Sequence, residues 1–492
     1  MAVIAVSSFE SLLFVALISI HLVASDHHAF GGAVFGVNSK FYGKERSIGV
    51  LRAHDSLRHL QILSAGIDVS IGGTGRLDAF GVGLYYAKIA IGTPPREYYV
   101  QVDTGCDIIW INCIECQECP KKGYHGLDLT LYDPELSFTG KPVTCDDEFC
   151  KELNGGTVTG CKANASCLYT EFYADGSEST GSFFKDFIQY DSVSGDLETK
   201  LATGGVIFGC GANQTGNLAS SEEAFDGILG FGKSNASVIS QLASSGKVKK
   251  MFAHCLDSDN GGGIFAIGHV VQPKVNSTHL IQDENEQHYA VNVTGIKVGT
   301  EYLNLSTDSY GRREKRRAII DSGTTLAYLP EVIYESLLKR IVEGQSGMRL
   351  TTLQHQYTCF ELPGSGVDGL PAVTFYFENS LSLKVYPHDY LFALDDFLCF
   401  GWQNNGIDPI SSKDTIILGD LVLSNKLVLY DLENQTIGWT EYNCSSSITL
   451  KDERTGLLHL VGAHSISSCC SMIISSPMIF LLLIALLNLM IP

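Results

Sequence analysis

The sequence predicts a mainly β protein with two related lobes and a few short helices. From Tyr85 onward, short apolar runs rich in β-branched and aromatic residues alternate with Gly, Pro, Asn and Asp turns, which is typical of β-strands. An apolar strand that ends in Asp-Thr-Gly or Asp-Ser-Gly occurs twice, as YYVQVDTG and AIIDSGTT. Each copy is followed downstream by an Ile-Leu-Gly segment, in FDGILGFG and TIILGDLV. This repeat predicts two pseudo-symmetric β lobes.

Length and composition agree with a large folded protein. The 492 residues are too many for one small core. Hydrophobic residues make up 45% of the chain, charged residues only 18%, and 50 residues are glycine, which excludes a disordered or coiled-coil chain. The formal charge of −20 excludes nucleic acid as a partner, because phosphate binding requires a concentrated Lys/Arg surface.

The first segments of the chain read as targeting and processing sequences. Residues 1–25 are expected to be a signal peptide, because Leu12 to Ala24 is apolar, too short to span a bilayer, and ends in small residues. Residues 26–72 are expected to be a removable pro-segment, since they are more basic than the chain that follows. Apolar residues at helical spacing in this segment leave an ordinary N-terminal helix as the alternative.

The two lobes are expected at residues 73–260, with Asp103, and at residues 261–445, with Asp321. The first lobe is the longer, and a Cys-rich insertion accounts for the excess. Short helices are expected near residues 238–243 and over 331–343, where Pro330 provides a start.

Cysteine usage predicts an oxidising compartment. Fifteen cysteines are present, with a dense group between Cys113 and Cys167 that includes the disulfide candidates Cys113 and Cys119. A zinc site is the alternative, but the C-x2-C-x2-C spacing lacks a second C-x2-C or a His pair at zinc-finger distance. We therefore expect disulfides, no metal and no other cofactor, with a connectivity that the sequence leaves open.

The C-terminal end carries a second targeting signal. Residues 446–467 are expected to link the second lobe to an anchor site at Ser467 or Ser468. Residues 468–492 are expected to be removed during attachment of a glycosylphosphatidylinositol anchor, because a short apolar tail follows small residues and a spacer. A plain membrane span is the alternative, although the tail is short and lacks flanking basic residues.

Two further surface features follow from local sequence. The basic run RREKRR, residues 312–317, is either an exposed loop or a processing site for a basic-specific protease. Eight N-x-S/T sequons predict surface glycosylation sites, at Asn164, Asn213, Asn235, Asn276, Asn292, Asn304, Asn434 and Asn443.

The two Asp-x-Gly segments point to acid–base chemistry. Peptide hydrolysis without a metal or a covalent nucleophile needs one carboxylate to deprotonate water while another protonates the carbonyl oxygen. Asp103 and Asp321 provide one carboxyl each, and two adjacent carboxyls share a proton because both cannot ionise together. Small residues around them permit tight loops and provide hydroxyls that hold the carboxylates, namely Gly105, Gly323, Thr104, Ser322 and Thr324.

With these motifs the chain resembles the pepsin-like aspartic proteases, from about Leu84 to Asn443, and most of all the plant nepenthesin-like and GPI-anchored members. The resemblance implies a bilobal fold, catalytic roles for Asp103 and Asp321, and protein or peptide substrates. It also implies that Tyr173 is the flap residue that closes over substrate and that Trp110 is its hydrogen-bond partner. A disulfide between Cys359 and Cys399 follows from the same resemblance. The chain departs from the usual pattern at Cys106, where the family commonly has serine.

The sequence thus predicts a secreted aspartic endopeptidase with an acidic pH optimum, monomeric and held at the outer leaflet of the plasma membrane by a lipid anchor. The main alternative is a non-catalytic binding or inhibitor protein on the same fold, since fold alone does not fix function. A structural cell-wall or adhesion role is a further alternative. A Ser/His mechanism is not favoured, because the G-x-S-x-G segment is missing and the histidines have no distinctive context.

Overall fold

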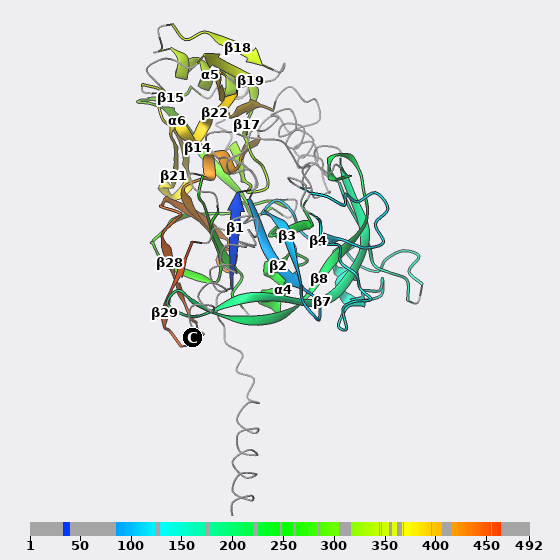
Figure 1. Cartoon of the computed structure of the whole chain (residues 1–492). Helices are drawn as coiled ribbons and strands as arrows, with labels where there is room; N and C mark the ends of the chain where they lie inside the picture. Colours follow the sequence, from blue (N-terminus) through cyan, green and yellow to red (C-terminus); the bar gives the residue numbers. More distant parts are fainter. Residues whose placement is uncertain are drawn as a thin grey trace, which may run out of the picture.

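A computed structural model of the chain describes residues 33–39 and most of residues 85–463. The gaps are 124–127, 163, 173–176, 220–224, 247, 259–261, 284–285, 305–315, 344, 346, 354–356, 362–366, 368, 395, 406–414 and 454. Figure 1 shows β-strands throughout, with short helices around them. The mainly β, two-lobed prediction is confirmed.

The largest sheet has 14 strands and carries the first lobe. Its path is β13-β27-β26-β10-β11-β1-β2-β3-β9-β4-β8-β7-β5, and β6 pairs with β7. The strands are β1 (Ala33–Ser39), β2 (Tyr85–Ile91), β3 (Arg96–Asp103), β4 (Ile109–Asn112), β5 (Lys141–Pro142), β6 (Leu168–Phe172), β7 (Glu178–Gly195), β8 (Glu198–Gln214), β9 (Gly227–Gly230), β10 (Met251–Leu256), β11 (Gly263–Ile267), β13 (Asn276–His279), β26 (Lys426–Asp431) and β27 (Thr436–Glu441).

The second lobe is built on an eight-stranded sheet in the order β21-β20-β14-β16-β25-β17-β24, with β15 beside β14. These strands are β14 (Ala290–Val298), β15 (Glu301–Tyr302), β16 (Arg316–Ile320), β17 (Ala327–Leu329), β20 (Val373–Phe377), β21 (Ser382–Val385), β24 (Trp402–Asn404) and β25 (Thr415–Leu418). A four-stranded sheet, β18-β19-β23-β22, completes the lobe. Its strands are β18 (Leu350–Leu353), β19 (Tyr357–Glu361), β22 (Leu391–Leu394) and β23 (Phe397–Phe400).

The helices are short. They are α3 (Glu148–Leu153), α4 (Val238–Ser244), α5 (Glu331–Val342), α6 (Pro387–Tyr390) and α7 (Asp420–Leu423), with 3-10 turns η2 (Gly216–Ala219) and η3 (Glu378–Ser380). The two helices expected from sequence correspond to α4 and α5. Helix α5 begins after Pro330 and buries one apolar face, with Ile333, Leu337 and Ile341.

The two lobes share the large sheet and a continuous core. Strand β10, in the segment assigned to the first lobe, pairs with β26, which lies in the segment assigned to the second lobe. The rings of Phe252 and Tyr430 stack across this junction with centroids 4.3 Å apart. The Tyr289 hydroxyl, from the second lobe, donates a 2.7 Å hydrogen bond to the carbonyl of Phe231 in the first. Aromatic packing therefore fixes how the lobes meet.

Strand β1 lies inside the segment assigned to the pro-segment. It pairs antiparallel with β11, β2 and β7, so it occupies an interior position in the large sheet. A segment before the first lobe is thus hydrogen-bonded to strands of that lobe.

The segment expected to be a linker after residue 445 also contains strands. Strands β28 (Ser447–Lys451) and β29 (Leu458–Gly462) form a hairpin that joins β12 (His269–Gln272) in a three-stranded sheet. The second lobe is therefore followed by a β-hairpin whose second strand ends at Gly462.

Six disulfides are present among the described residues. Cys113 bonds to Cys210 and Cys119 to Cys116, while Cys359 bonds to Cys399 as the resemblance implied. The others join Cys145 to Cys161, Cys150 to Cys167 and Cys255 to Cys444. Cys106 lies outside these pairs, and its buried thiol donates to the Ile108 carbonyl, 3.3 Å away.

In the part of the chain that the structure describes, no helix is both long and apolar enough to cross a membrane. The terminal segments that carry the signal-peptide and anchor predictions, with Ser467 and Ser468, lie outside the described residues.

Candidate active site

Asp103 is the last residue of β3, and it is fully buried. Strand β3 runs parallel to β9, so that Asp103 lies opposite Gly230 of the Ile-Leu-Gly segment. The amide of Phe231 donates to the Asp103 carbonyl at 2.8 Å, and the amide of Gly105 donates to its Oδ1 at 2.8 Å. The carboxyl is thereby fixed at the end of a buried strand.

Asp321 follows β16 in the second lobe and is equally buried. Strand β16 runs parallel to β25, and the Asp321 amide donates to the carbonyl of Leu418, 3.0 Å away. Gly323 donates its amide to Asp321 Oδ1 at 3.0 Å, as Gly105 does to Asp103. The Thr324 hydroxyl adds a 2.6 Å bond to Oδ2. Each lobe thus binds its Asp carboxyl through the amide of the glycine two residues later.

The two Asp-containing loops contact each other through reciprocal hydrogen bonds. The Thr104 amide donates to Ser322 Oγ at 3.2 Å, and the Ser322 amide donates to Thr104 Oγ1 at 2.9 Å. Both side chains are buried, where an unmet amide would cost about 1–3 kcal/mol. Thr104 and Ser322, 218 residues apart in sequence, therefore join the two loops and bring the segments that carry Asp103 and Asp321 side by side.

Glycines in the Ile-Leu-Gly segments allow these loops to approach the strands beneath them. A Cβ at Gly230 would lie 2.2 Å from the Ile108 carbonyl oxygen, and one at Gly419 would lie 2.4 Å from the carbonyl oxygens of Leu326 and Thr324. Only glycine fits at either position, which explains why the motif recurs in both lobes.

The other carboxyls of the repeated motifs have structural positions. Asp226 accepts hydrogen bonds from the amides of Tyr99 and Thr130, both at 2.7 Å. Burial raises the pKa of Asp226 to about 7, although these two amides act to lower it. Asp420 is fully buried at the start of α7, and its amide donates to the Thr324 carbonyl at 2.8 Å.

The expected flap lies partly outside the described residues, which exclude Tyr173. Trp110 is described: it is buried in β4, where it pairs with Ile228 of β9 and Gly209 of β8. Its hydrogen bond to Tyr173 stays a prediction.

One further carboxyl, that of Glu171, interacts electrostatically with Asp103, and sequence reasoning did not single it out. Glu171 lies on β6, two residues before Tyr173, with its side chain partly exposed. Burial raises the pKa of Glu171 well above its ordinary value, and the carboxylates of Asp107 and Asp103 raise it further. The signal for this residue in the sequence is its position next to the expected flap tyrosine.

The sequons lie mostly on the surface. Asn213 and Asn292 are partly buried, and the remaining six are exposed. Among the described residues, no group of three or more His, Cys, Asp or Glu side chains could hold a metal ion.

A two-lobed β fold that joins one Asp-Thr/Ser-Gly loop from each lobe defines the pepsin-type aspartic proteinases. Family models described as xylanase inhibitor N-terminal and C-terminal match residues 85–269 and 288–441. Aspartic proteinase 36 of Arabidopsis thaliana is 46% identical over 453 residues, which are 92% of each chain. Aspartic proteinase 39 of the same plant is 45% identical over 88% of this chain and 89% of its own. The chain therefore belongs to the pepsin-type aspartic proteinase family, and it is an aspartic endopeptidase.

More distant relatives share the fold. Aspartic proteinase nepenthesin-2 of Nepenthes gracilis is 26% identical over 75% of this chain and 79% of its own. The crystal structure of Basic 7S globulin from soybean matches with a TM-score of 0.59 and 18% identity, covering 84% of this chain and 96% of the globulin. Conglutin gamma from lupine seeds matches with a TM-score of 0.60 and 18% identity, covering 84% of this chain and 95% of conglutin gamma. These structures indicate the fold alone.

Proposed function

We propose that Asp103 and Asp321 share one proton and hydrolyse a peptide bond with a water molecule held between them, most rapidly at acidic pH. The reciprocal hydrogen bonds between Thr104 and Ser322 carry this proposal, because they join the two Asp loops. The ionised carboxyl removes a proton from water while the neutral one donates a proton to the substrate carbonyl oxygen. The tetrahedral intermediate then collapses: the carboxyl that took a proton from water delivers it to the leaving nitrogen, and the C–N bond breaks. The other carboxylate takes back a proton from the intermediate's hydroxyl, which restores the shared proton.

Replacing either Asp with Asn tests the assignment. Asp103→Asn or Asp321→Asn retains size but removes a titrating carboxyl, so we expect a loss of several orders of magnitude in acid proteolysis without unfolding. Asp128→Asn is the matched control, since that carboxylate is exposed and forms a surface ion pair with Lys122. The wild-type rate should be bell-shaped in pH, and a peptide mimic with a hydroxyl in place of the attacking water should inhibit it. An Asp321→Asn enzyme with undiminished acid proteolysis would falsify the assignment.

The matching family models carry the description of xylanase inhibitors, which are binding proteins. A proteinase is favoured here because both Asp-x-Gly loops are intact and held alike. A purified chain that inhibits a xylanase and cleaves no denatured protein at any acidic pH would favour the binding function instead.

The chain also has features of a secreted precursor. Residues 1–25 are proposed to direct secretion, and residues 26–72 to keep the enzyme latent. Two observations support latency: β1 is hydrogen-bonded inside the large sheet, and both Asp103 and Asp321 are fully buried in the full-length chain. Activity should therefore rise when the full-length protein is acidified, with loss of the segment visible by mass spectrometry. Full activity of the uncleaved chain would contradict latency.

At the other end, a glycolipid attached at Ser467 or Ser468 is proposed to hold the enzyme at the cell surface as a monomer that acts on protein or peptide substrates. The six exposed sequons support glycosylation on the secretory route. Phosphatidylinositol-specific phospholipase C should release the enzyme from membranes. Retention of the enzyme after that treatment would favour a plain membrane span.

A further inference from the structure

Exposed leucines gather at one end of the molecule. Among the described residues, five of the fifteen exposed large hydrophobic side chains lie either at the tip of the β7–β8 hairpin or on the β28–β29 hairpin. They are Leu197, Leu201, Leu457, Leu458 and Leu460, with exposed fractions of 66%, 61%, 59%, 55% and 37%. We refer to these five residues as the leucine patch. Exposed apolar side chains that gather on one surface mark an interaction site.

Hydrogen bonds join the two segments of the leucine patch. The Leu197 amide donates to the Leu460 carbonyl at 2.8 Å, and the Leu460 amide donates to Asp196 Oδ1 at 3.0 Å. Figure 1 shows the β7–β8 hairpin reaching β29 at the bottom of the view. Segments far apart in the sequence therefore form one surface.

The outward-facing side of β29 carries leucines, whereas the outer face of an edge strand in a soluble protein normally carries polar side chains. Val461 faces inward and belongs to a buried cluster with Ile448 and Leu450, so Leu458 and Leu460 face outward. Leu197, at the tip of the β7–β8 hairpin, has a positive φ of 56°, where Gly or Asn is preferred over an exposed leucine.

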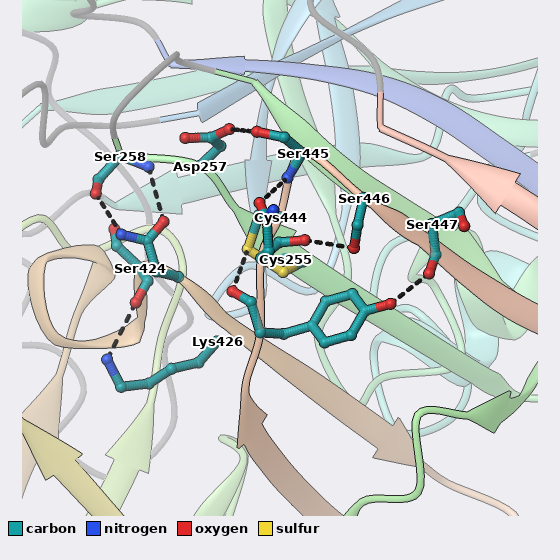
Figure 2. The surroundings of a disulfide bond; sticks show 12 residues. Cys255, Asp257, Ser258, Ser424, Lys426, Cys444, Ser445, Ser446 and Ser447 are labelled. Carbon is teal, nitrogen blue, oxygen red and sulfur yellow. Dashed lines mark hydrogen bonds between the residues drawn. A yellow bond between two sulfur atoms is a disulfide. The ribbon is translucent and has the colours of Figure 1, made fainter.

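The leucine patch is held rigidly to the body of the enzyme. Figure 2 shows the Cys255–Cys444 disulfide immediately before β28, which ties the start of the hairpin to β10. Around it, Ser445 donates to Asp257, and the Tyr442 hydroxyl donates to the Ser447 carbonyl. The leucines are thus presented on a fixed surface.

The charges beside the leucine patch are balanced. Among the described residues, the acidic Asp196, Glu198, Asp452 and Glu453 lie on or beside the two hairpins together with the basic Lys200, Lys249 and Lys451. Glu453 forms ion pairs with His269, Lys249 and Lys451, at 2.5, 3.4 and 3.7 Å. A surface without an excess of Lys and Arg suits neutral lipid headgroups rather than anionic ones.

We propose that the leucine patch rests on the lipid bilayer and inserts its side chains among neutral headgroups, which orients the enzyme on the membrane. The described chain ends at Ala463, directly after β29, and the residues beyond it include the apolar run Met478 to Pro492. An anchor at Ser467 would leave at most about 14 Å of extended chain between the lipid and Ala463. This inference deepens the proposed anchoring and rests on it for the position of the membrane.

Vesicle flotation tests the proposal. The full-length protein is expressed in cells, freed of its lipid by phospholipase C, and floated with phosphatidylcholine vesicles. We expect measurable binding that falls about tenfold for each leucine replaced, in Leu201→Ser and Leu458→Ser, because each removes buried apolar area. Leu350→Ser is the matched control: this residue is 44% exposed on β18, at the opposite end of Figure 1. Equal binding by wild type and the double variant, or an equal loss in the control, overturns the proposal.

A second measurement separates the leucine patch from the anchor. Hydrogen exchange of the full-length protein bound to phosphatidylcholine vesicles should slow at residues 197–201 and 457–460 relative to detergent. If phospholipase C fails to release the protein while this protection is present, the proposed glycolipid anchor is wrong and the proposed contact of the leucine patch with the bilayer is supported. Release by phospholipase C without such protection supports the glycolipid anchor and overturns the proposed contact between the leucine patch and the bilayer. A dimer in sedimentation that the double variant dissociates, without vesicle binding, makes the surface an interface between copies instead.

Discussion

The carboxyl of Asp226 shows how a single residue couples stability to pH. It sits in the Phe-Asp-Gly-Ile-Leu-Gly segment beneath the Asp103 loop and bonds two amides of neighbouring segments. Since burial raises its pKa from 3.8 to about 7, the folded protein holds a proton that the unfolded chain has released between those values. Its stabilising effect is complete below pH 3.8 and is lost as the pH rises through 7.

Asp226→Asn should therefore flatten the loss of stability between pH 4 and 7. The loss attributable to this group in the wild type is up to ~4 kcal/mol, at 1.36 kcal/mol per pKa unit. Urea unfolding at pH 4, 5.5 and 7 measures it. A variant with the wild-type pH slope would show that Asp226 ionises as freely as it does in the unfolded chain.

A second buried group acts in the opposite direction. Burial lowers the pKa of His254 from 6.5 to about 3, and its Nε2 lies 3.2 Å from the Tyr430 hydroxyl. As the pH falls below 6.5, the imidazole of His254 binds a proton in the unfolded chain but not yet in the folded protein. His254 therefore lowers the free energy of unfolding as the pH falls from 6.5 toward 3. The two residues together favour a broad stability maximum at mildly acidic pH.

At the scale of elements, the Ile-Leu-Gly strands β9 and β25 support the Asp-containing loops. Each runs parallel to the strand that leads to an Asp. Gly230 ends β9 and Gly419 directly follows β25, and both glycines pack against backbone carbonyls. A residue with a side chain at either glycine position would push the strand away from the loop that it supports.

Gly419→Ala should displace the loop around Thr324 and reduce both activity and stability. The added Cβ would lie 2.4 Å from two backbone oxygens that cannot move independently, so we expect destabilisation of about 2–3 kcal/mol and at least a tenfold loss of kcat. Gly205→Ala is the control, because a Cβ there meets no atom within 4 Å. Thermal unfolding and acid proteolysis measure the pair, and equal behaviour of the two variants would contradict the packing role.

At the scale of the whole molecule, the C-terminal part of the described chain is joined to the first lobe. Strand β26 pairs with β10, and the Cys255–Cys444 disulfide closes a loop with a sequence separation of 189. The same junction positions the C-terminal hairpin that carries part of the leucine patch (Figure 2).

Removing this disulfide should cost far more stability than removing a local one. The loop-closure relation gives about 5 kcal/mol for a separation of 189 in Cys255→Ala/Cys444→Ala. The same relation gives ~1.6 kcal/mol for the Cys116–Cys119 pair, with a separation of 3, which is the control. Urea unfolding of the two double variants at one pH compares them. Similar losses would show that the β10–β26 pairing alone holds the junction.

Periodicity, turn residues and the duplicated Asp-x-Gly and Ile-Leu-Gly motifs were sufficient to predict two β lobes, both Asp loops and helices α4 and α5. These features are local, because both the alternation of side chains along a strand and the requirement for glycine beside a loop depend on residues that are close in sequence. The pairing of Thr104 with Ser322, the elevated pKa of Asp226, the partners of Cys113 and Cys119, and the position of β1 inside the sheet came only from the tertiary structure. The same is true of the leucine patch. Its leucines belong to two hairpins more than 250 residues apart in sequence, and only the fold brings these hairpins together. Such features depend on which distant segments the fold brings into contact, and that is decided by packing and hydrogen bonding across the whole molecule.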